Sequence, residues 1–150
     1  MAQSLSQLYI HIIFHTKSDG TKIRETDETE LYRYIAGIIK ESDSFPIIVN
    51  GTDNHIHILC SMSKNIALAK LVEEIKRNSS RWIKTKDDYY KDFAWQAGYA
   101  GYSISQSQKE TVRQYIEKQK EHHTKQSFKD EYIVFLQNYG IEYDERYLWS

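Results

Sequence analysis

Two histidines one residue apart, His55 and His57, are the side chains of this sequence best suited to bind a metal ion. They follow a turn-forming segment, residues 51–54, and belong to an apolar run that predicts a β-strand. Side chains alternate across a strand, so both imidazoles project from one face and Ile56 projects from the other. Two neighbouring imidazoles can hold a divalent ion and leave its other positions open. The alternative is that they are polar positions on a half-exposed sheet.

A second pair of residues with chemical potential lies on a predicted helix. Ser107 and Glu110 have the spacing of a capping box, so we expect this helix to begin there. Tyr115 and Gln119 are four residues apart and therefore lie one above the other on its apolar stripe. A glutamine on such a stripe needs a polar partner. This favours a functional role for Tyr115 over the alternative, in which it is a buried structural tyrosine.

The order of the predicted elements indicates how these residues are positioned. Strands are expected at 8–15, 46–50, 55–60 and 93–105, and helices at 26–41, 65–84, 107–123 and 127–138. Up to residue 105 this order is the ferredoxin-like pattern, an α+β fold in which two helices cover one face of an antiparallel sheet. The helix that carries Tyr115 then covers the opposite face.

Two further histidines, His11 and His15, lie on the first predicted strand. Four residues along a strand separate their side chains by about 13 Å, which is too far for one ion to bind both. We expect structural or surface histidines, either of which could line a site.

Length and composition indicate one ordered domain, residues 1–150, with about 126–150 forming a C-terminal helix and tail. The single cysteine, Cys60, excludes an internal disulfide and is expected to be a small core residue in a reducing compartment. The first residues lack the pattern of a signal peptide, and no apolar run is long enough to span a bilayer. A cytoplasmic protein with no membrane partner is the expectation.

The net charge of −1 does not by itself predict a nucleic-acid-binding protein, but the charges are unevenly distributed. Residues 64–91 contain eight basic and four acidic side chains, whereas 19–43 and 126–150 are acidic. The predicted helix 65–84 carries a basic side, formed by Lys76, Arg77, Arg81 and Lys84. This side either contacts DNA phosphates or is a solvated helix surface.

Taken together, these motifs resemble the single-tyrosine HUH transposases of the smallest bacterial insertion sequences, which include the REP-associated tyrosine transposases. The resemblance rests on a His-hydrophobic-His strand, a basic helix, the motif Trp95-Gln96-x-Gly98-Tyr99, and the helix motif Tyr115-Ile116-x-x-Gln119-x-x-His122-His123. It runs from Tyr9 to about His123 and implies the HUH endonuclease fold.

The resemblance also implies a function, a metal-dependent nuclease and strand transferase that acts on single-stranded DNA. Tyr115 would be the nucleophile, producing a 5′-phosphotyrosine intermediate and a free 3′-OH, followed by strand rejoining for excision and insertion. His55, His57 and Gln119 would bind Mg²⁺ or Mn²⁺. The expected partner is single-stranded or hairpin DNA at the ends of an insertion sequence. A homodimer is expected. In this family the tyrosine helix of one subunit usually completes the histidine site of the other, but the sequence does not decide between that arrangement and sites built within one chain.

Three alternatives remain open at this stage. A replication-type HUH nickase would share the chemistry, although such proteins usually carry extra domains. A histidine-triad hydrolase needs a third histidine where this chain has Leu59. A domesticated hairpin-binding protein would have lost one of His55, His57, Tyr115 or Gln119, and all four are present.

Overall fold

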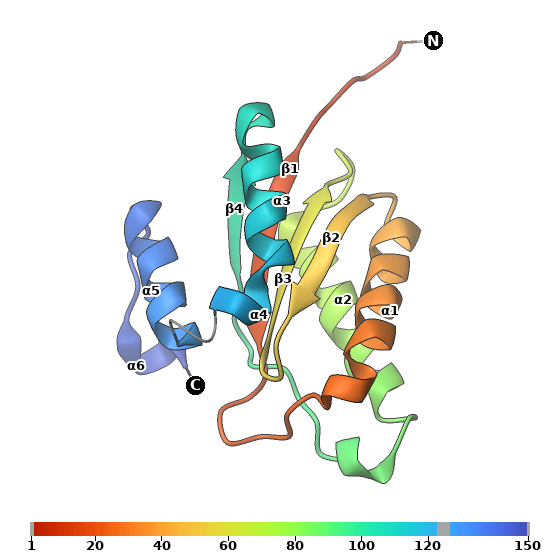
Figure 1. Ribbon diagram of the computed structural model, residues 1–150. Coiled ribbons are helices and arrows are strands. Elements are labelled where there is room, and N and C mark those ends of the chain that lie inside the picture. Colours follow the sequence, from red (N-terminus) through yellow and green to blue (C-terminus); the bar gives the residue numbers. More distant parts are fainter. Residues whose placement is uncertain (1, 123–126, 150) are drawn as a thin grey trace.

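Four strands form a single antiparallel sheet in the computed structural model, which describes residues 2–122 and 127–149 (Figure 1). The strands are β1 (Tyr9–His15), β2 (Phe45–Gly51), β3 (His55–Ser61) and β4 (Ala100–Ile104), in the spatial order β2-β3-β1-β4. This is the order of a ferredoxin-like sheet, and the predicted α+β fold is therefore confirmed. His123 and the side chain of His122, both part of the helix motif, lie outside the described residues.

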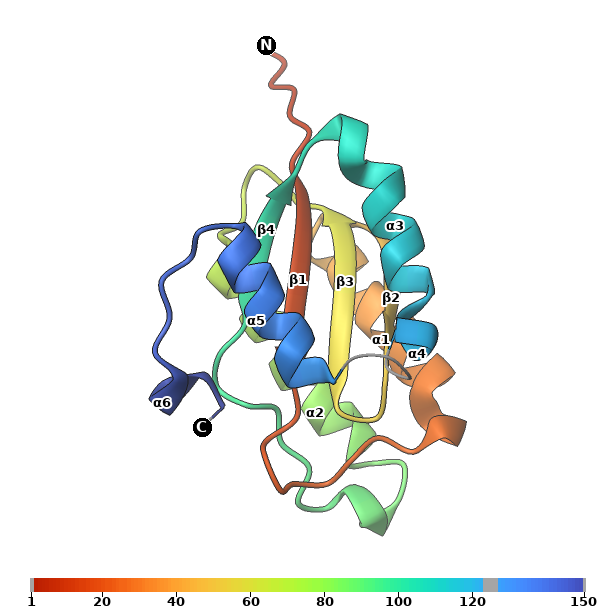
Figure 2. The ribbon, with the colours of Figure 1, turned by 60° about the vertical axis from the view of Figure 1, so that its left-hand side comes forward.

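Helices cover both faces of this sheet. On one face lie α1 (Glu28–Glu41) and α2 (Leu68–Ile83), and on the other lie α3 (Lys109–Glu117), α4 (Gln119–His122) and α5 (Phe128–Asn138), followed by α6 (Glu145–Leu148). Figure 2 shows α5 lying across β1 and β3. Short 3-10 turns occupy Glu25–Asp27, Asp88–Tyr90 and Gln106–Gln108. Within the described ranges, none of the helices combines the length and the apolar character needed to cross a membrane.

The alternation of side chains along the strands produces two separate apolar clusters. Ile12, Phe14, Ile56 and Ile58 pack with the buried stripe of α1 and with α2 in the first cluster. The second cluster lies on the other face and combines residues of the sheet with Ile116 of α3 and with α5 residues. Its members from α5 are Phe128, Tyr132, Phe135 and Leu136.

The last strand is shorter than predicted. We expected a strand from Phe93 to Ser105, but β4 begins at Ala100, and only Trp95 forms an isolated bridge, with Thr16. The backbone N–H of Gln96 still donates to the carbonyl of His15 at the end of β1, at 2.9 Å, but the carbonyls that follow bond to a side chain. Lys76 Nζ donates to the carbonyls of Gln96 and Gly98, at 2.8 and 2.6 Å.

The predicted capping box at the start of the tyrosine helix is wrong. Helix α3 begins at Lys109 after a 3-10 turn, and its N-cap residue, Gln108, makes no side-chain capping bond. The Ser107 hydroxyl lies 3.1 Å from that of Ser105, and the carboxylate of Glu110 pairs with Arg113 at 2.8 Å. Both expected capping groups are therefore used elsewhere.

The turn between β2 and β3 fixes where His55 begins its strand. A Cβ on Gly51 would lie 2.1 Å from the carbonyl oxygen of His55, closer than any side chain can approach. That same carbonyl accepts the backbone N–H of Thr52 at 3.0 Å. Gly51 is thus required by the tight approach of two backbone segments at this turn.

Candidate active site

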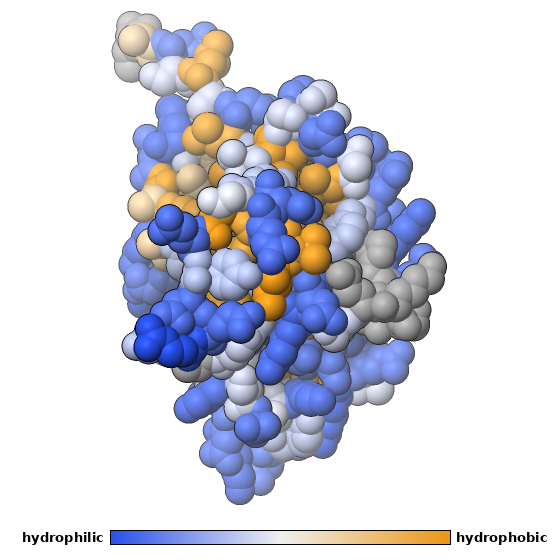
Figure 3. Space-filling view, turned by 90° about the vertical axis from the view of Figure 1, so that its left-hand side faces the viewer, coloured by the Kyte–Doolittle hydropathy of each residue, from blue (hydrophilic) through white to orange (hydrophobic). Residues whose placement is uncertain are grey.

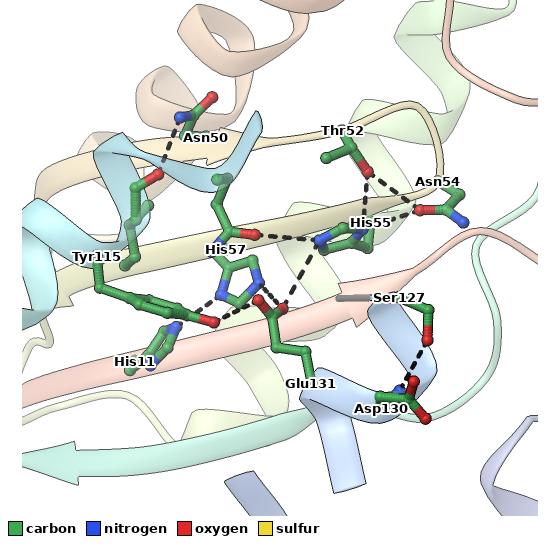
Figure 4. Close-up of polar contacts among 12 residues, drawn as sticks. His11, Asn50, Thr52, Asn54, His55, His57, Tyr115, Ser127, Asp130 and Glu131 are labelled. Atoms are coloured by element: carbon green, nitrogen blue, oxygen red, sulfur yellow. Dashed lines mark hydrogen bonds and ion pairs between the residues drawn. The ribbon is translucent and has the colours of Figure 1, made fainter. Parts of the chain in front are cut away.

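The two histidines of β3 lie on the sheet face covered by α3, α4 and α5 (Figure 4). They are opposite Ile13 and His15 of β1, so the pairing register places β1 side chains around them. Both imidazoles are completely buried. The prediction that His55 and His57 share one face is confirmed, whereas the alternative of a half-exposed sheet is wrong.

Helix α3 brings Tyr115 to the same place. The side chain of Asn50 on β2 donates to the carbonyls of Ile116 and Glu117, at 2.9 and 3.2 Å, and ties the end of α3 to the sheet. The Tyr115 ring consequently lies 6.0 Å from the ring of His57, centroid to centroid, within one chain.

Gln119 reaches the site from a separate short helix. We expected one continuous helix through this region, but it is interrupted at Lys118, whose backbone leaves the helical conformation. Gln119 then begins α4, is completely buried, and points its Oε1 at Nε2 of His55 at 3.3 Å. Tyr115, Gln119 and the two histidines therefore meet within one chain, through a broken helix.

A residue that the sequence analysis did not identify, Glu131 of α5, lies at the centre of the cluster. Its Oε1 is 2.9 Å from Nε2 of His57 and 3.9 Å from Nε2 of His55. Its Oε2 accepts the hydroxyl of Tyr115 in a short hydrogen bond. The sequence does contain a signal for Glu131, because it is a carboxylate on the apolar stripe formed by Phe128, Tyr132, Phe135 and Leu136.

The hydrogen bonds behind His55 determine which of its ring nitrogens faces the site. Its Nδ1 lies 2.8 Å from the hydroxyl oxygen of Thr52 and 2.8 Å from Oδ1 of Asn54. The Thr52 hydroxyl itself donates to Asn54 Oδ1, so both oxygens are available to accept a proton from Nδ1. Nε2 of His55 is then unprotonated and presents a lone pair toward Gln119.

His57 has an equivalent support in His11, which is buried on β1. His57 Nδ1 lies 2.9 Å from Nε2 of His11. Burial, and then the neighbouring His57, lower the pKa of His11 well below its usual value, so His11 is neutral and can accept the Nδ1 proton. His15 is also buried and lies next to Phe128. Neither histidine is on the surface, and His11 lines the site.

These donors fit a divalent metal ion. With Nδ1 of His55 protonated, its Nε2 and the Oε1 of Gln119 are both hydrogen-bond acceptors, and a cation between them satisfies both. The potential ligand atoms of His55, His57 and Glu131 lie within 4.8 Å of one another. Buried imidazole, carboxylate and amide groups are a suitable ligand set for a divalent ion such as Mn²⁺.

The electrostatic state of the site follows from its burial. Burial, and secondly the hydrogen bond to the Glu131 carboxylate, raise the pKa of Tyr115 above its usual value. Burial opposes ionisation of Glu131, but the interactions with His57 and Tyr115 outweigh it and lower the pKa of Glu131 to about 2. The site therefore holds a neutral phenol next to an ionised carboxylate.

Helix α5 closes this site from solvent. Phe128 stacks on the ring of His55, with centroids 4.1 Å apart, and Phe135 packs against His11, His57 and Tyr115. Figure 3 shows apolar side chains grouped in the middle of the molecular face on this side.

The four basic residues of α2 are not brought to this cluster, because α2 covers the other face of the sheet. Lys76 is half-buried, and this burial lowers its pKa to about 8. Arg77 pairs with Glu74 at 2.8 Å, while Arg81 and Lys84 are exposed.

Comparisons with known proteins agree with this fold. The sequence profile of the family described as "Transposase IS200 like" matches residues 4–119. A candidate transposase from Deinococcus radiodurans R1 has a similar structure, with a TM-score of 0.61 and 18% identity over 79% of this chain and 98% of that one. A REP-associated tyrosine transposase bound to a REP hairpin gives a TM-score of 0.56 and 11% identity, over 85% of this chain and 76% of that one. No curated protein sequence gives a significant match.

At these identities the two structures establish similarity of fold, whereas the sequence profile covers well over half of the chain and includes both histidines, Tyr115 and Gln119. The chain therefore belongs to the family of IS200-like transposases.

Proposed function

We propose that this protein is a metal-dependent transposase of single-stranded DNA that cleaves with Tyr115. The observation that carries the proposal is that the half-buried phenol of Tyr115 meets two imidazoles and one amide that are completely buried. Membership of a transposase family supports the assignment of this cluster to DNA cleavage.

The metal ion would be held by His55, His57 and Gln119, and we propose Mg²⁺ or Mn²⁺. Imidazole ligands favour Mn²⁺, whereas the oxygen ligands suit either ion. When bound, such an ion would orient the scissile phosphate and stabilise the negative charge that develops on it.

The nucleophile is the phenol oxygen of Tyr115. It forms a bond to the scissile phosphorus as the bond from phosphorus to the 3′ oxygen breaks, while the phenol loses its proton and the leaving 3′ oxygen gains one. The products are a 5′-phosphotyrosine and a free 3′-OH. Because this linkage is still a phosphodiester, a second 3′-OH can attack it and rejoin strands without a nucleotide cofactor, as excision and insertion require.

We further propose that the DNA is single-stranded or folded as a hairpin at the ends of an insertion sequence. The similar structure that carries a REP hairpin supports this substrate. Arg77, Arg81 and Lys84 would contact backbone phosphates away from the cleaved bond, because α2 is on the other face of the sheet. Lys76 instead donates to the backbone carbonyls of Gln96 and Gly98.

The deciding experiment uses the purified protein and single strands from the ends of the element, recognised by palindromes on both sides of the gene. Strands labelled at the 5′ or 3′ end are incubated with Mn²⁺, Mg²⁺ or EDTA and examined on a denaturing gel. A covalent adduct that carries the downstream strand should form only with metal, be absent in Tyr115→Phe, and persist in Tyr139→Phe. Tyr139 is a matched control because its ring is exposed and stacks on Tyr102.

Each part of the proposal can fail separately in this experiment. An adduct in Tyr115→Phe would exclude this tyrosine as the nucleophile, and an adduct in EDTA would exclude the metal. Tight hairpin binding without any adduct would identify a domesticated DNA-binding protein instead.

The expected homodimer has its own test. Tyr115→Phe protein is mixed with His57→Ala protein under conditions in which subunits exchange. Recovered cleavage would mean that the tyrosine of one subunit serves the histidines of the other. No recovery would mean that each site is built within one chain, as the 6.0 Å separation of the Tyr115 and His57 rings allows.

A further inference from the structure

Glu131 lies outside the part of the chain that matches the transposase family, residues 4–119. It is nevertheless 97% shielded from solvent, with an exposed fraction of only 3%, and both of its carboxylate oxygens contact groups of the candidate active site. The rest of the acidic segment near it, such as Asp130, is exposed. This contrast within one helix requires an explanation.

We propose that Glu131 belongs to the catalytic centre and has two roles in it. Its Oε1 is a further ligand of the divalent ion beside His55 and His57, and its Oε2 positions the hydroxyl of Tyr115. The inference rests on the proposed function for the identity of the ion and the nucleophile, and it adds the C-terminal helix α5 to the site.

The distances around Oε1 match those of a coordination sphere. Ligand atoms about 2.1 Å from an ion in octahedral geometry lie about 3 Å from their neighbours and about 4 Å from the ligand opposite. Oε1 lies 2.9 Å from His57 Nε2 and 3.9 Å from His55 Nε2, and Gln119 Oε1 lies 3.3 Å from His55 Nε2. Small adjustments of these side chains therefore admit an ion among the four groups.

The negative charge of Glu131 is compatible with an ion at this position. A buried carboxylate is stable only when it is paired with a positive charge or bound to a metal. Without an ion, Glu131 pairs with the imidazoles of His57 and His55, at 2.9 and 3.9 Å, and accepts the hydroxyl of Tyr115. An imidazole that binds a metal ion is neutral. In the metal-bound state, the carboxylate of Glu131 would find its positive partner in the ion itself.

The packing of α5 holds the carboxylate in this position. Ser127 caps the helix by accepting the backbone N–H of Asp130 at 3.2 Å (Figure 4). Phe128 and Phe135, three residues before and four after Glu131, stack against His55 and pack against Tyr115. Glu131 thus enters the site between two aromatic anchors, and this arrangement fixes the distance from its Oε2 to the nucleophile.

The test measures Mn²⁺ binding by the full-length protein without DNA, using calorimetry or the electron paramagnetic resonance signal of free Mn²⁺. The Glu131→Gln variant keeps the size of the side chain and removes its charge. We expect its Mn²⁺ affinity to fall at least about tenfold, since loss of even an outer-sphere partner of a metal ligand costs 10–100-fold. Asp130→Asn removes the same charge from the adjacent, exposed position and should bind Mn²⁺ like the wild type.

Covalent adduct formation is the second measurement. If Glu131 works as proposed, Glu131→Gln also forms the adduct more slowly at saturating Mn²⁺, because the Tyr115 hydroxyl has lost its acceptor. Wild-type affinity for Mn²⁺ in Glu131→Gln, or adduct formation that is unchanged or faster, would overturn the inference and leave α5 as a cover over the site.

A third measurement does not depend on a folded variant. Anomalous diffraction from wild-type crystals soaked in Mn²⁺ locates the ion directly. An ion beyond bonding distance of both Glu131 oxygens, about 2.0–2.6 Å for hard divalent ions, would contradict the proposal. If Mn²⁺ binds through Glu131 but no adduct forms with any DNA end, the proposed function fails while the metal ligand stands.

Discussion

Strand β3 buries Ile56 and Ile58 on one face of the sheet and His55 and His57 on the other, and all four side chains are completely shielded from solvent. The isoleucines face α1 and α2, where a fully buried side chain of this size contributes about 1.5–3 kcal/mol to stability. The histidines face α3, α4 and α5, where burial of a polar group costs about 1–3 kcal/mol unless a partner compensates. Burial on the first face stabilises the fold, whereas burial of polar groups on the second face lowers stability and holds a reactive site.

The two histidines of the site face are each supported by side chains from outside β3. Thr52 and Asn54 support His55 from the β2–β3 turn, and His11 supports His57 from β1. The apolar face requires no such pairing, because dispersion contacts are not directional. Substituting a histidine of β3 should therefore reduce activity, whereas substituting a neighbouring isoleucine should reduce stability.

The largest effect is expected for His57→Ala. This change removes a metal ligand and should reduce adduct formation by at least about a hundredfold, beyond what loss of a supporting partner costs. Its circular dichroism spectrum should remain that of the wild type. Adduct formation at the normal rate in Mn²⁺ would contradict the assignment of His57, and loss of the native spectrum would contradict the separation of the two faces.

The neighbouring change Ile58→Ala should act on stability instead. Removing this buried side chain should lower the free energy of unfolding by about 2–5 kcal/mol, measured by urea denaturation. Below its midpoint of unfolding the variant should still form the adduct. Phe45→Ala, at a side chain that is 63% exposed, is the control and should change stability by less than about 0.5 kcal/mol.

Metal addition should stabilise the protein only through the site face. At a Mn²⁺ concentration a hundred times the dissociation constant, binding to the native state adds about 2.7 kcal/mol to the free energy of unfolding. The thermal midpoint should therefore rise by about 5–10 °C in wild type and return on addition of EDTA. An equal rise in His57→Ala would show that the ion binds elsewhere.

The smallest effect is expected on the outer surface of α2. Lys84→Ala should weaken hairpin binding without changing the adduct rate at saturating DNA. The slope of the logarithm of the binding constant against the logarithm of the salt concentration should become shallower by about one. Lys40→Ala, at an exposed position of α1, serves as the control. If both lysine variants bind the hairpin like the wild type, the basic side of α2 is a solvated surface.

The residues of the site that could be predicted from sequence are those whose local spacing determines their direction. Alternation placed His55 and His57 on one face, and a separation of four residues placed Tyr115 near Gln119, even though the helix breaks at Lys118. The sequence order of the elements also predicted the sheet topology.

Contacts between distant segments could not be predicted in the same way. The bond from His57 to His11 depends on the register between β3 and β1, which neither strand specifies alone. Glu131 was missed because it lies in the acidic C-terminal segment, beyond the motifs that carry the resemblance. β4 was predicted too long because the binding of Lys76 to the carbonyls before it cannot be read from spacing.

The close approach of Gly51 to the carbonyl of His55 has a consequence for how this sequence can change length. Deleting a single residue between Thr52 and Asn54 would shift β3 by one position against its neighbours. Since side chains alternate, that shift would turn the histidines into the aliphatic core and the isoleucines toward Tyr115. Insertions and deletions in this turn should therefore be tolerated only in pairs of residues. In a library of turn-length variants selected for folding alone, the surviving variants should differ from the wild type by an even number of residues.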